Sequence, residues 1–195
     1  MFGMPNGLIC SKGSMLDKSK YLLKYHDFYH QRIHTLKEQV KRLKARLPQD
    51  KFVQHELVKF AARVRHADQT LIPEDPNKKE YQLKGVLRKF RRYKQGLRRY
   101  RLFFCFSSTP PIILYLYLND EKHLRKEGDR NDPYEYFRRL VKKGTFSHDP
   151  SDENIQRWIQ KSKRPWIYKE HYGGNQGRTL FYKSTSMSSM GVCPC

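Results

Sequence analysis

The spacing of hydrophobic residues changes once along this chain, near Tyr81, and this change restricts the possible folds more than any other feature. Before Tyr81, apolar residues recur at steps of three and four, which is typical of amphipathic helices. After Tyr81, apolar and polar residues alternate, which is typical of strands. Helices followed by strands indicate an α+β fold in which the helices pack on a sheet.

The first half of the chain predicts a helical hairpin. One long helix is expected after residues 14–17 and ends at Pro48, and a second runs from about Asp50 to about Thr70, ahead of a turn at 72–77. The apolar seam of the first helix consists of Leu22, His26, Tyr29, Ile33, Leu36, Val40, Leu43 and Leu47. The second helix has its apolar face at Val53, Leu57, Phe60, Ala61, Val64 and Leu71.

A small antiparallel sheet is predicted in the second half, with strands at residues 83–93, 97–106 and 112–118 joined by hairpin turns. A short edge strand at residues 6–9 is compatible with it. The last strand alternates, so its two faces are expected to differ. A helix-covered core would take Ile112, Leu114, Leu116 and Leu118. The opposite, exposed face would carry Ile113, Tyr115 and Tyr117.

A C-terminal helix is predicted to begin at Asp132. Asp132 can cap it, Pro133 suits its first turn, and Glu135 occupies the position of a capping-box partner. Gly144 can close this helix, and a last short helix is expected from Asp149.

The length of 195 residues fits one domain with a tail. Beyond residue 163 the chain gains glycine and serine and loses its periodicity. We therefore expect one domain over residues 1–162 and a partly ordered or disordered tail over residues 163–195.

Neither membrane insertion nor export is predicted. The most apolar stretch, residues 102–118, is interrupted at 107–111 and is shorter than the ~20 residues that a spanning helix needs. The first ten residues lack the basic start and apolar run of a secretory signal. The four cysteines do not form a disulfide framework or a set of metal-ligand pairs. A cytoplasmic protein with reduced thiols is expected.

The chain carries a formal net charge of +21, from 40 Lys and Arg against 19 Asp and Glu. Between Lys84 and Arg101 there are nine cations and no acid, and on a two-stranded hairpin several of them would lie within reach of one polyanion. A phosphate backbone is the expected ligand, although a solvated basic edge that only blocks strand pairing is the alternative. The predicted binding cations are Lys84, Arg88, Lys89, Arg91, Arg92, Lys94 and Arg98.

Tyrosines near this basic run would add ring faces on which unpaired bases can stack, in particular Tyr115 and Tyr117. The alternative for these rings is ordinary packing in a sheet or core.

Other chemistry finds little support in the sequence. His26, His30 and His34 recur at a helical spacing, but His26 lies on the apolar seam and no acid of the HExxH kind flanks them, so we predict no metal site and no cofactor. The sequence also lacks the motifs of serine hydrolases, of phosphate-binding loops and of zinc deaminases.

Several runs in the second half together resemble one family. They are Arg99-Tyr100-Arg101-Leu102-Phe103-Phe104, Ile112-Ile113-Leu114, Asn119-Asp120-Glu121, Leu124-Arg125, Gly128, and Asp132-Pro133-Tyr134 with Phe137. With these runs the chain resembles the YhaV family, toxins of bacterial type II toxin–antitoxin systems. The resemblance extends from about Pro5 to about Ile159.

This resemblance implies a RelE/ParE-like fold: a long N-terminal helical hairpin packed on a small antiparallel sheet, with C-terminal helices. It implies an endoribonuclease, an mRNA interferase that arrests growth by cutting RNA, either free or on the ribosome, and so inhibits translation. It further implies a cognate antitoxin of the PrlF type, and binding to operator DNA only through the antitoxin complex.

RNA can be cleaved without a metal when the ribose 2′-OH attacks the adjacent phosphate and the protein stabilises the charged intermediate. Arg101 matches the strand arginine that faces the substrate in RelE-like toxins, so we expect it to clamp the phosphate, with Arg99 on the same face. Arg125 is expected near the leaving oxygen, and Tyr134 is expected to stack a base or to handle a proton. Asp120 is either a general base or, as we favour, a structural partner of Arg125 or of the strand-end backbone.

Two other classes of function stay open. One is a non-catalytic RNA- or ribosome-binding protein, and the other is a ParE-like inhibitor of a DNA topoisomerase, because a fold alone does not separate these. In either case the charge of the Lys84–Arg101 surface predicts an acidic or partly disordered antitoxin segment that covers it.

Overall fold

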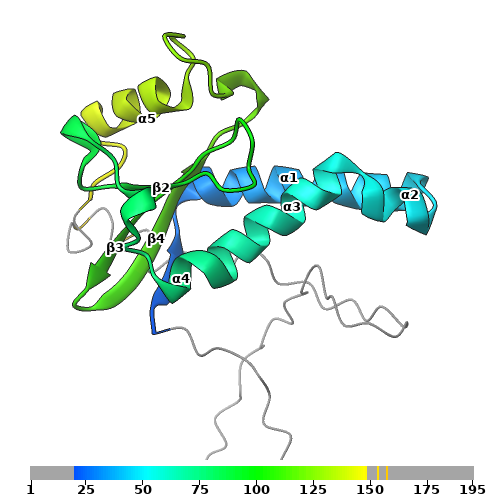
Figure 1. Ribbon diagram of the computed structural model, residues 1–195, viewed down its shortest axis with the longest axis horizontal. Helices are drawn as coiled ribbons and strands as arrows, with labels where there is room; N and C mark the ends of the chain where they lie inside the picture. The colour runs from blue at the N-terminus through cyan, green and yellow to red at the C-terminus, as the bar shows by residue number, and fades with distance from the viewer. Residues whose placement is uncertain (1–19, 149–152, 154–156, 158–195) are drawn as a thin grey trace, which may run out of the picture.

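The computed structural model describes residues 20–148 together with residues 153 and 157, and these residues form a mixed helix-and-sheet fold (Figure 1). Helices lie on both faces of one sheet: α1 and α3 pack on one face and α5 lies on the other. The elements are β1 (Leu22–Tyr25), α1 (Asp27–Arg46), α2 (Gln49–Gln54), α3 (Glu56–His66), α4 (Ile72–Glu74), β2 (Arg91–Tyr93), β3 (Leu102–Ser108), β4 (Pro111–Leu118) and α5 (Pro133–Lys142). The predicted α+β class is confirmed.

The sheet has the strand order β1-β4-β3-β2, and β1 runs parallel to β4 while the other pairs are antiparallel. The prediction of a helix through residues 22–25 is therefore wrong. His26 ends this strand and caps α1, because its Nδ1 accepts a hydrogen bond of 3.2 Å from the backbone N–H of Phe28. The apolar residues of β1 fit a helical seam equally well, and only their pairing with β4 makes them a strand.

The predicted second helix is broken. His55 takes an extended backbone conformation between α2 and α3, and its Nδ1 caps α3 by accepting from the N–H of Leu57 at 3.2 Å. A π-helical turn over Ala67–Leu71 then leads into α4. Val53, expected on the apolar face, is exposed, and Phe52 is buried in its place.

The basic segment is not a long two-stranded hairpin. Gly85 has a positive φ of 60° and opens a 3-10 turn, so β2 is only three residues long. A second irregular stretch contains Gly96 and Arg98, with φ of 68° and 52°, so β3 begins only at Leu102. Positive φ values are incompatible with an extended strand. The third predicted strand, by contrast, agrees with β4 within one residue.

Both faces of β4 are buried, so the prediction of an exposed aromatic face is wrong. A bulge interrupts the regular alternation of β4. It lies between Phe103 and Phe104 of β3, where Phe103 pairs with Tyr117 and Phe104 pairs with Tyr115, so the register shifts by one residue. Ile113 and Tyr115 pack with the helical layer, together with Leu118. The α5 side takes Leu114, Leu116 and Tyr117.

A buried carboxylate joins the helical layer to the sheet. Asp68, in the π-helical turn, is fully buried and accepts a hydrogen bond from Tyr29 Oη of α1 at 2.5 Å, while its carbonyl accepts from Tyr115 Oη of β4 at 2.5 Å. Gln69 donates to the Asp68 carboxylate at 3.2 Å and to Tyr25 Oη at 3.0 Å. Burial and the charge of Asp68 raise the pKa of Tyr29 and Tyr115, so both hydroxyls stay protonated and donate.

The helix predicted from Asp132 is present as α5. Asp132 caps it by accepting from the N–H of Tyr134 at 3.0 Å, and Gly144 follows its end with φ of 73°. Glu135 does not complete a capping box in this structure but pairs with Arg138 at 2.6 Å.

Three expectations fall outside the residues that the structure describes: the edge strand at 6–9, the last short helix from Asp149, and the tail over 163–195. Within the described part of the chain, no helix is long and apolar enough to cross a membrane.

The buried His26 is expected to make stability depend on pH. Burial lowers its pKa from 6.5 to about 4, so the unfolded chain takes up a proton on this residue at a higher pH than the folded protein. The contribution is complete above pH 6.5 and is lost as the pH falls toward 4, with a total of about 3 kcal/mol. Urea unfolding at pH 7 and pH 4 should show that His26→Asn, which keeps a capping side chain, loses less stability than wild type over this range. The matched control is His34→Asn, at an exposed position of α1, which should behave like wild type.

The hydroxyl of Tyr115 is expected to matter for stability. Tyr115→Phe leaves the buried carbonyl of Asp68 without this donor, and the free energy of unfolding should fall by about 1–3 kcal/mol. Urea unfolding of the full chain measures this. An unchanged free energy would contradict the role of the Asp68 network.

Candidate active site

Two arginines lie against the ring of Tyr134, and a third lies near one of them. Arg92 comes from β2, Arg101 directly precedes β3, Arg125 lies in the loop after β4, and Tyr134 stands in the first turn of α5. The guanidinium carbons of Arg92 and Arg125 lie 5.8 and 5.4 Å from the centre of the Tyr134 ring, which is cation–π geometry. We call Arg92, Arg101 and Arg125 the arginine cluster.

The sheet brings this cluster together around Phe103. Arg92 pairs with Phe103 across β2 and β3, so their side chains share a face of the sheet. Arg101 lies two residues before Phe103 and faces the same way. The Tyr134 ring meets Phe103 edge to face, with ring centres 5.5 Å apart. Phe103 is therefore the apolar floor of the site.

Asp132 positions Arg125. Its Oδ2 accepts from Arg125 Nη1 at 2.6 Å and from the N–H of Lys126 at 2.9 Å, and the carboxylate is almost fully buried. Burial works to lower the pKa of Arg125, but the hydrogen bond and charge of Asp132 outweigh it and raise that pKa. The loop is also fixed by reciprocal bonds: the N–H of Arg125 donates to the carbonyl of Arg99 at 3.0 Å, and Arg99 Nε donates to the carbonyl of Arg125 at 3.1 Å.

Arg101 is held through its backbone and through one end of its guanidinium. Its N–H donates to Oδ1 of the buried Asn119 at 2.5 Å, and its Nη1 donates to the carbonyls of Arg98 and Tyr100 at 2.6 and 2.7 Å. Its Nε is buried without a hydrogen-bond partner, and the same is true of Arg92 Nε. Buried donors without partners are uncommon, and here they lie beside two further positive charges.

The positive charges of the cluster act on one another. Burial lowers the pKa of Arg92; Tyr134 works against this, and the nearby charges of Arg101 and Arg125 lower it further. Guanidinium groups nevertheless stay charged at neutral pH. The repulsion between them is relieved when an anion binds, so the cluster is suited to a phosphate group.

The other predicted catalytic residues have different positions. Arg99 is exposed at the rim of the site, tied to the Arg125 loop. Asp120 caps the 3-10 turn after β4, where its Oδ1 accepts from the N–H groups of Lys122 and His123 and contacts His123 Nδ1 at 2.8 Å. Burial works to raise the pKa of Asp120, but the hydrogen bonds and the nearby positive charges hold it below its usual value. Asp120 therefore serves the strand-end backbone, while Arg125 pairs with the buried Asp132 and with the exposed Glu127 at 3.3 Å.

The basic run does not form one patch, contrary to the prediction. Arg91 turns to the other face, where it lies 5.4 Å from the Phe106 ring and donates to Asn77 at 3.1 Å. Arg98 pairs with Glu56 of α3 at 3.1 Å. Arg91 and Arg92 are neighbours in β2, so their side chains face opposite sides of the sheet. The remaining predicted cations are exposed: Lys84, Arg88, Lys89 and Lys94.

Tyr115 and Tyr117 do not offer ring faces to bases, so this prediction is wrong as well. Tyr115 is fully buried against Asp68, and Tyr117 is 6% exposed, with its ring stacked on Phe103 at 6.1 Å. Conversely, the contacts by which Asn119 holds Arg101 and Asp132 holds Arg125 were not predicted. Asn119 and Asp132 lie in the motifs quoted above, which was the available signal.

Among the described residues, no group of three or more histidine, cysteine or acidic side chains is arranged to hold a metal ion. His26 is buried, and its Nδ1 caps α1.

Partly buried guanidinium groups whose charges act on one another, two of them against a tyrosine ring, give this basic α+β protein a cluster suited to an anion. Residues 23–157 match the family model described as a toxin with endonuclease activity, of a toxin–antitoxin system. This match covers more than half of the chain, so the chain belongs to the YhaV toxin family.

Curated relatives include the ribonuclease toxin YhaV of Escherichia coli K12 and the toxin YhaV of Escherichia coli O157:H7, each 38% identical over 68 residues. The aligned segment covers 35% of this chain and 42% of each relative, so the chain spans less than half the length of the relatives it matches. No solved structure matches this chain.

The ion pair between Arg125 and Asp132 is expected to stabilise the site loop. Asp132→Asn keeps a side chain that can cap α5 but removes the charge that faces Arg125. The free energy of unfolding should fall by about 1–2 kcal/mol, because Arg125 loses the buried one of its two acidic partners and keeps only the exposed Glu127 at 3.3 Å. Urea unfolding measures this, and Asp129→Asn, which removes an exposed pair with Lys126, should change little. Equal losses in both variants would contradict the positioning role of Asp132.

Proposed function

We propose that this chain is the toxin of a type II toxin–antitoxin system and a metal-independent endoribonuclease of RelE/ParE-like fold. The arginine cluster carries this proposal, because the Nε groups of Arg92 and Arg101 are buried donors without partners, Arg92 lies against Tyr134, and the charge of Arg101 acts on Arg92. Membership of the YhaV family supports the activity, and the helical layer packed on a small sheet supports the fold.

In the proposed reaction the ribose 2′-OH attacks the adjacent phosphorus and gives up its proton. The bond from phosphorus to the 5′-oxygen breaks, that oxygen takes up a proton, and a 2′,3′-cyclic phosphate and a 5′-OH remain. Arg101 and Arg92 stabilise the extra negative charge on the phosphoryl oxygens, and Arg125 stabilises the leaving oxygen. Tyr134, held between Arg92 and Arg125, stacks a flanking base or transfers a proton. Arg99 guides the strand from the rim.

The partners follow from the same charges. RNA, free or on the ribosome, is the proposed substrate. The proposed antitoxin is of the PrlF type, and an acidic or partly disordered segment of it covers the arginine cluster and the exposed cations near it, which blocks RNA entry. Operator DNA is bound only through the antitoxin complex.

Arg101→Ala should abolish growth arrest and lower the rate of RNA cleavage by at least ~100-fold, because a main donor to the charged phosphate is lost. The rate is measured with purified protein and RNA in the presence of a chelator, and the cut sites are mapped in induced cells by primer extension. Arg88→Ala removes an exposed cation of the same basic run and should retain most of the activity.

The result that would overturn this assignment is a folded Arg101→Ala protein that still cleaves RNA. Protection of RNA without new 5′ ends would instead indicate a non-catalytic RNA- or ribosome-binding protein. Growth arrest with intact transcripts and a DNA-damage response would indicate a topoisomerase inhibitor.

A further inference from the structure

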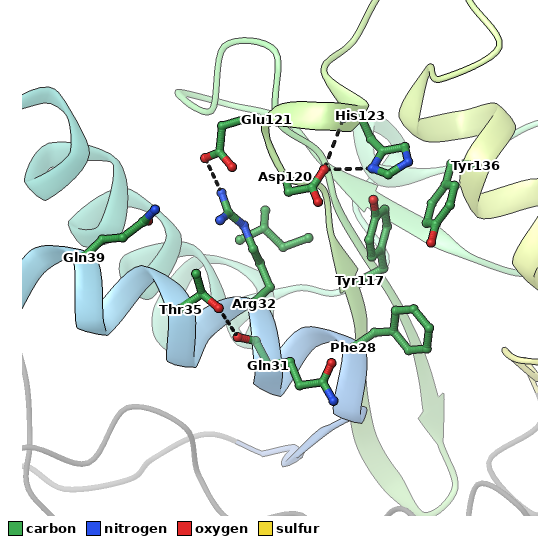
Figure 2. Close-up of a pocket in the computed structure, with 11 residues that line it drawn as sticks. Phe28, Gln31, Arg32, Thr35, Gln39, Tyr117, Asp120, Glu121, His123 and Tyr136 are labelled. Carbon is green, nitrogen blue, oxygen red and sulfur yellow. Dashed lines mark hydrogen bonds and ion pairs between the residues drawn. The ribbon is translucent and has the colours of Figure 1, made fainter.

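A second pocket lies beside the arginine cluster, across the segment that follows β4. It has a volume of about 330 Å³ and lies between α1, the end of β4 with its 3-10 turn, and Tyr136 of α5 (Figure 2). Asn119 separates the two sites: its Oδ1 accepts from the N–H of Arg101, and its Nδ2 donates to the carbonyl of His123, which lines the pocket. On α5, Tyr134 faces the cluster while Tyr136, two residues later, faces the pocket.

The pocket holds polar atoms that the fold leaves unused. Tyr117 Oη, Arg32 Nε and Gln39 Oε1 are all buried without a hydrogen-bond partner. Two of the side chains are more than nine-tenths buried, Tyr117 at 6% and Arg32 at 9% exposed. Burial and the nearby Asp120 and Tyr136 raise the pKa of Tyr117, so its hydroxyl remains a donor. Buried polar groups without partners destabilise a protein, so their convergence on one pocket indicates a ligand.

The charged side chains of the pocket argue against an anion, because two carboxylates, Glu121 and Asp120, line it beside Arg32. Arg32 pairs with Glu121 at 2.8 Å, and Asp120 contacts His123 at 2.8 Å (Figure 2). An acidic peptide or a phosphate would meet both carboxylates here. A neutral ligand with its own donors and acceptors would instead find acceptors in Asp120 and Gln39, and donors in Arg32 and Tyr117.

The walls of the pocket suit a flat ring. Tyr136 packs on His123 with ring centres 4.0 Å apart, and Phe28 of α1 lies on another side with an exposed ring. Rings of this kind stack on nucleobases that are not paired.

We propose that this pocket binds one unpaired base of the RNA strand whose phosphate occupies the arginine cluster, and that it favours guanine. Guanine presents a carbonyl acceptor beside N–H donors on one edge, which matches the donors Tyr117 and Arg32 and the acceptors Asp120 and Gln39. Adenine lacks the carbonyl. This inference rests on the proposed function, because it places the base next to the cleaved phosphate.

The test compares two tyrosines of the same strand. Tyr117→Phe removes a hydroxyl without a partner, so stability should not fall, while the preference for guanine should be lost. Tyr115→Phe removes a hydroxyl that is bonded to Asp68, so stability should fall while the preference for guanine remains. If Tyr117 had only a structural role, Tyr117→Phe would not lose the guanine preference while keeping its stability.

Binding is measured by fluorescence anisotropy with labelled oligodeoxythymidylates that do or do not contain one guanine. These probes lack the 2′-OH and cannot be cleaved by the proposed reaction, so the assay is independent of catalysis. The single guanine should tighten binding to wild type about 10-fold. Tyr117→Phe and Gln39→Leu should reduce this ratio to near 1, and the exposed Gln54→Leu of α2 should keep it.

The inference is overturned if wild type binds both probes equally, or if Tyr117→Phe keeps the guanine preference. It is also overturned if Tyr117→Phe weakens binding of a polyglutamate peptide and leaves the guanine preference intact, since the pocket would then serve an acidic partner. A guanine preference in a protein that leaves RNA uncut would contradict the proposed nuclease activity but not the pocket.

Discussion

The buried carboxylate of Asp68 is the contact on which the arrangement of helices and sheet depends. An ionised carboxylate inside a protein destabilises the fold unless hydrogen bonds compensate for the lost water. Here Tyr29 and Gln69 donate to it, and Tyr115 donates to its backbone carbonyl. The π-helical turn presents the side chain and the carbonyl of one residue to partners from α1 and β4. These bonds tie α1, the π-helical turn and β4 to one another.

From that fixed sheet the site is built at one strand end. β4 is anchored by Tyr115 in its middle, and the residues that follow it fasten the loop: Asn119 bonds to Arg101, and Asp132 bonds to Arg125. The guanidinium group of Arg92 thus comes from β2, that of Arg101 comes from the residue before β3, and that of Arg125 comes from a loop that is bonded to the segment before β3 and to the N-cap of α5. Groups held in this way are preorganised, which is the condition that the proposed stabilisation of a transition state requires.

The sequence predicted correctly those helices and strands that local signals mark. The predictions were wrong where an element or a side chain depends on a partner that is distant in the chain. β4 and α5 were predicted because alternation, a capping aspartate and a proline mark them locally. β1 was read as helix, since its strand character comes only from pairing with β4. Tyr115 was expected at the surface because its partner Asp68 lies in another layer. Of the residues that the family motifs suggested for catalysis, Arg125 and Tyr134 are in contact. Arg92 joins them because the strand register places it beside Phe103, and the charge of Arg101 acts on Arg92.

The parallel pairing of β1 with β4 also has a consequence for the order of folding. Leu22 pairs with Ile112, 90 residues later in the chain, and the whole helical layer lies between them. Closing so long a loop loses chain entropy before the contacts form, and high contact order slows folding. During synthesis the first strand stays without its neighbour until β4 has left the ribosome. A protein of this topology therefore completes its sheet, and the strand ends that hold the arginine cluster, only after β4 has been synthesised.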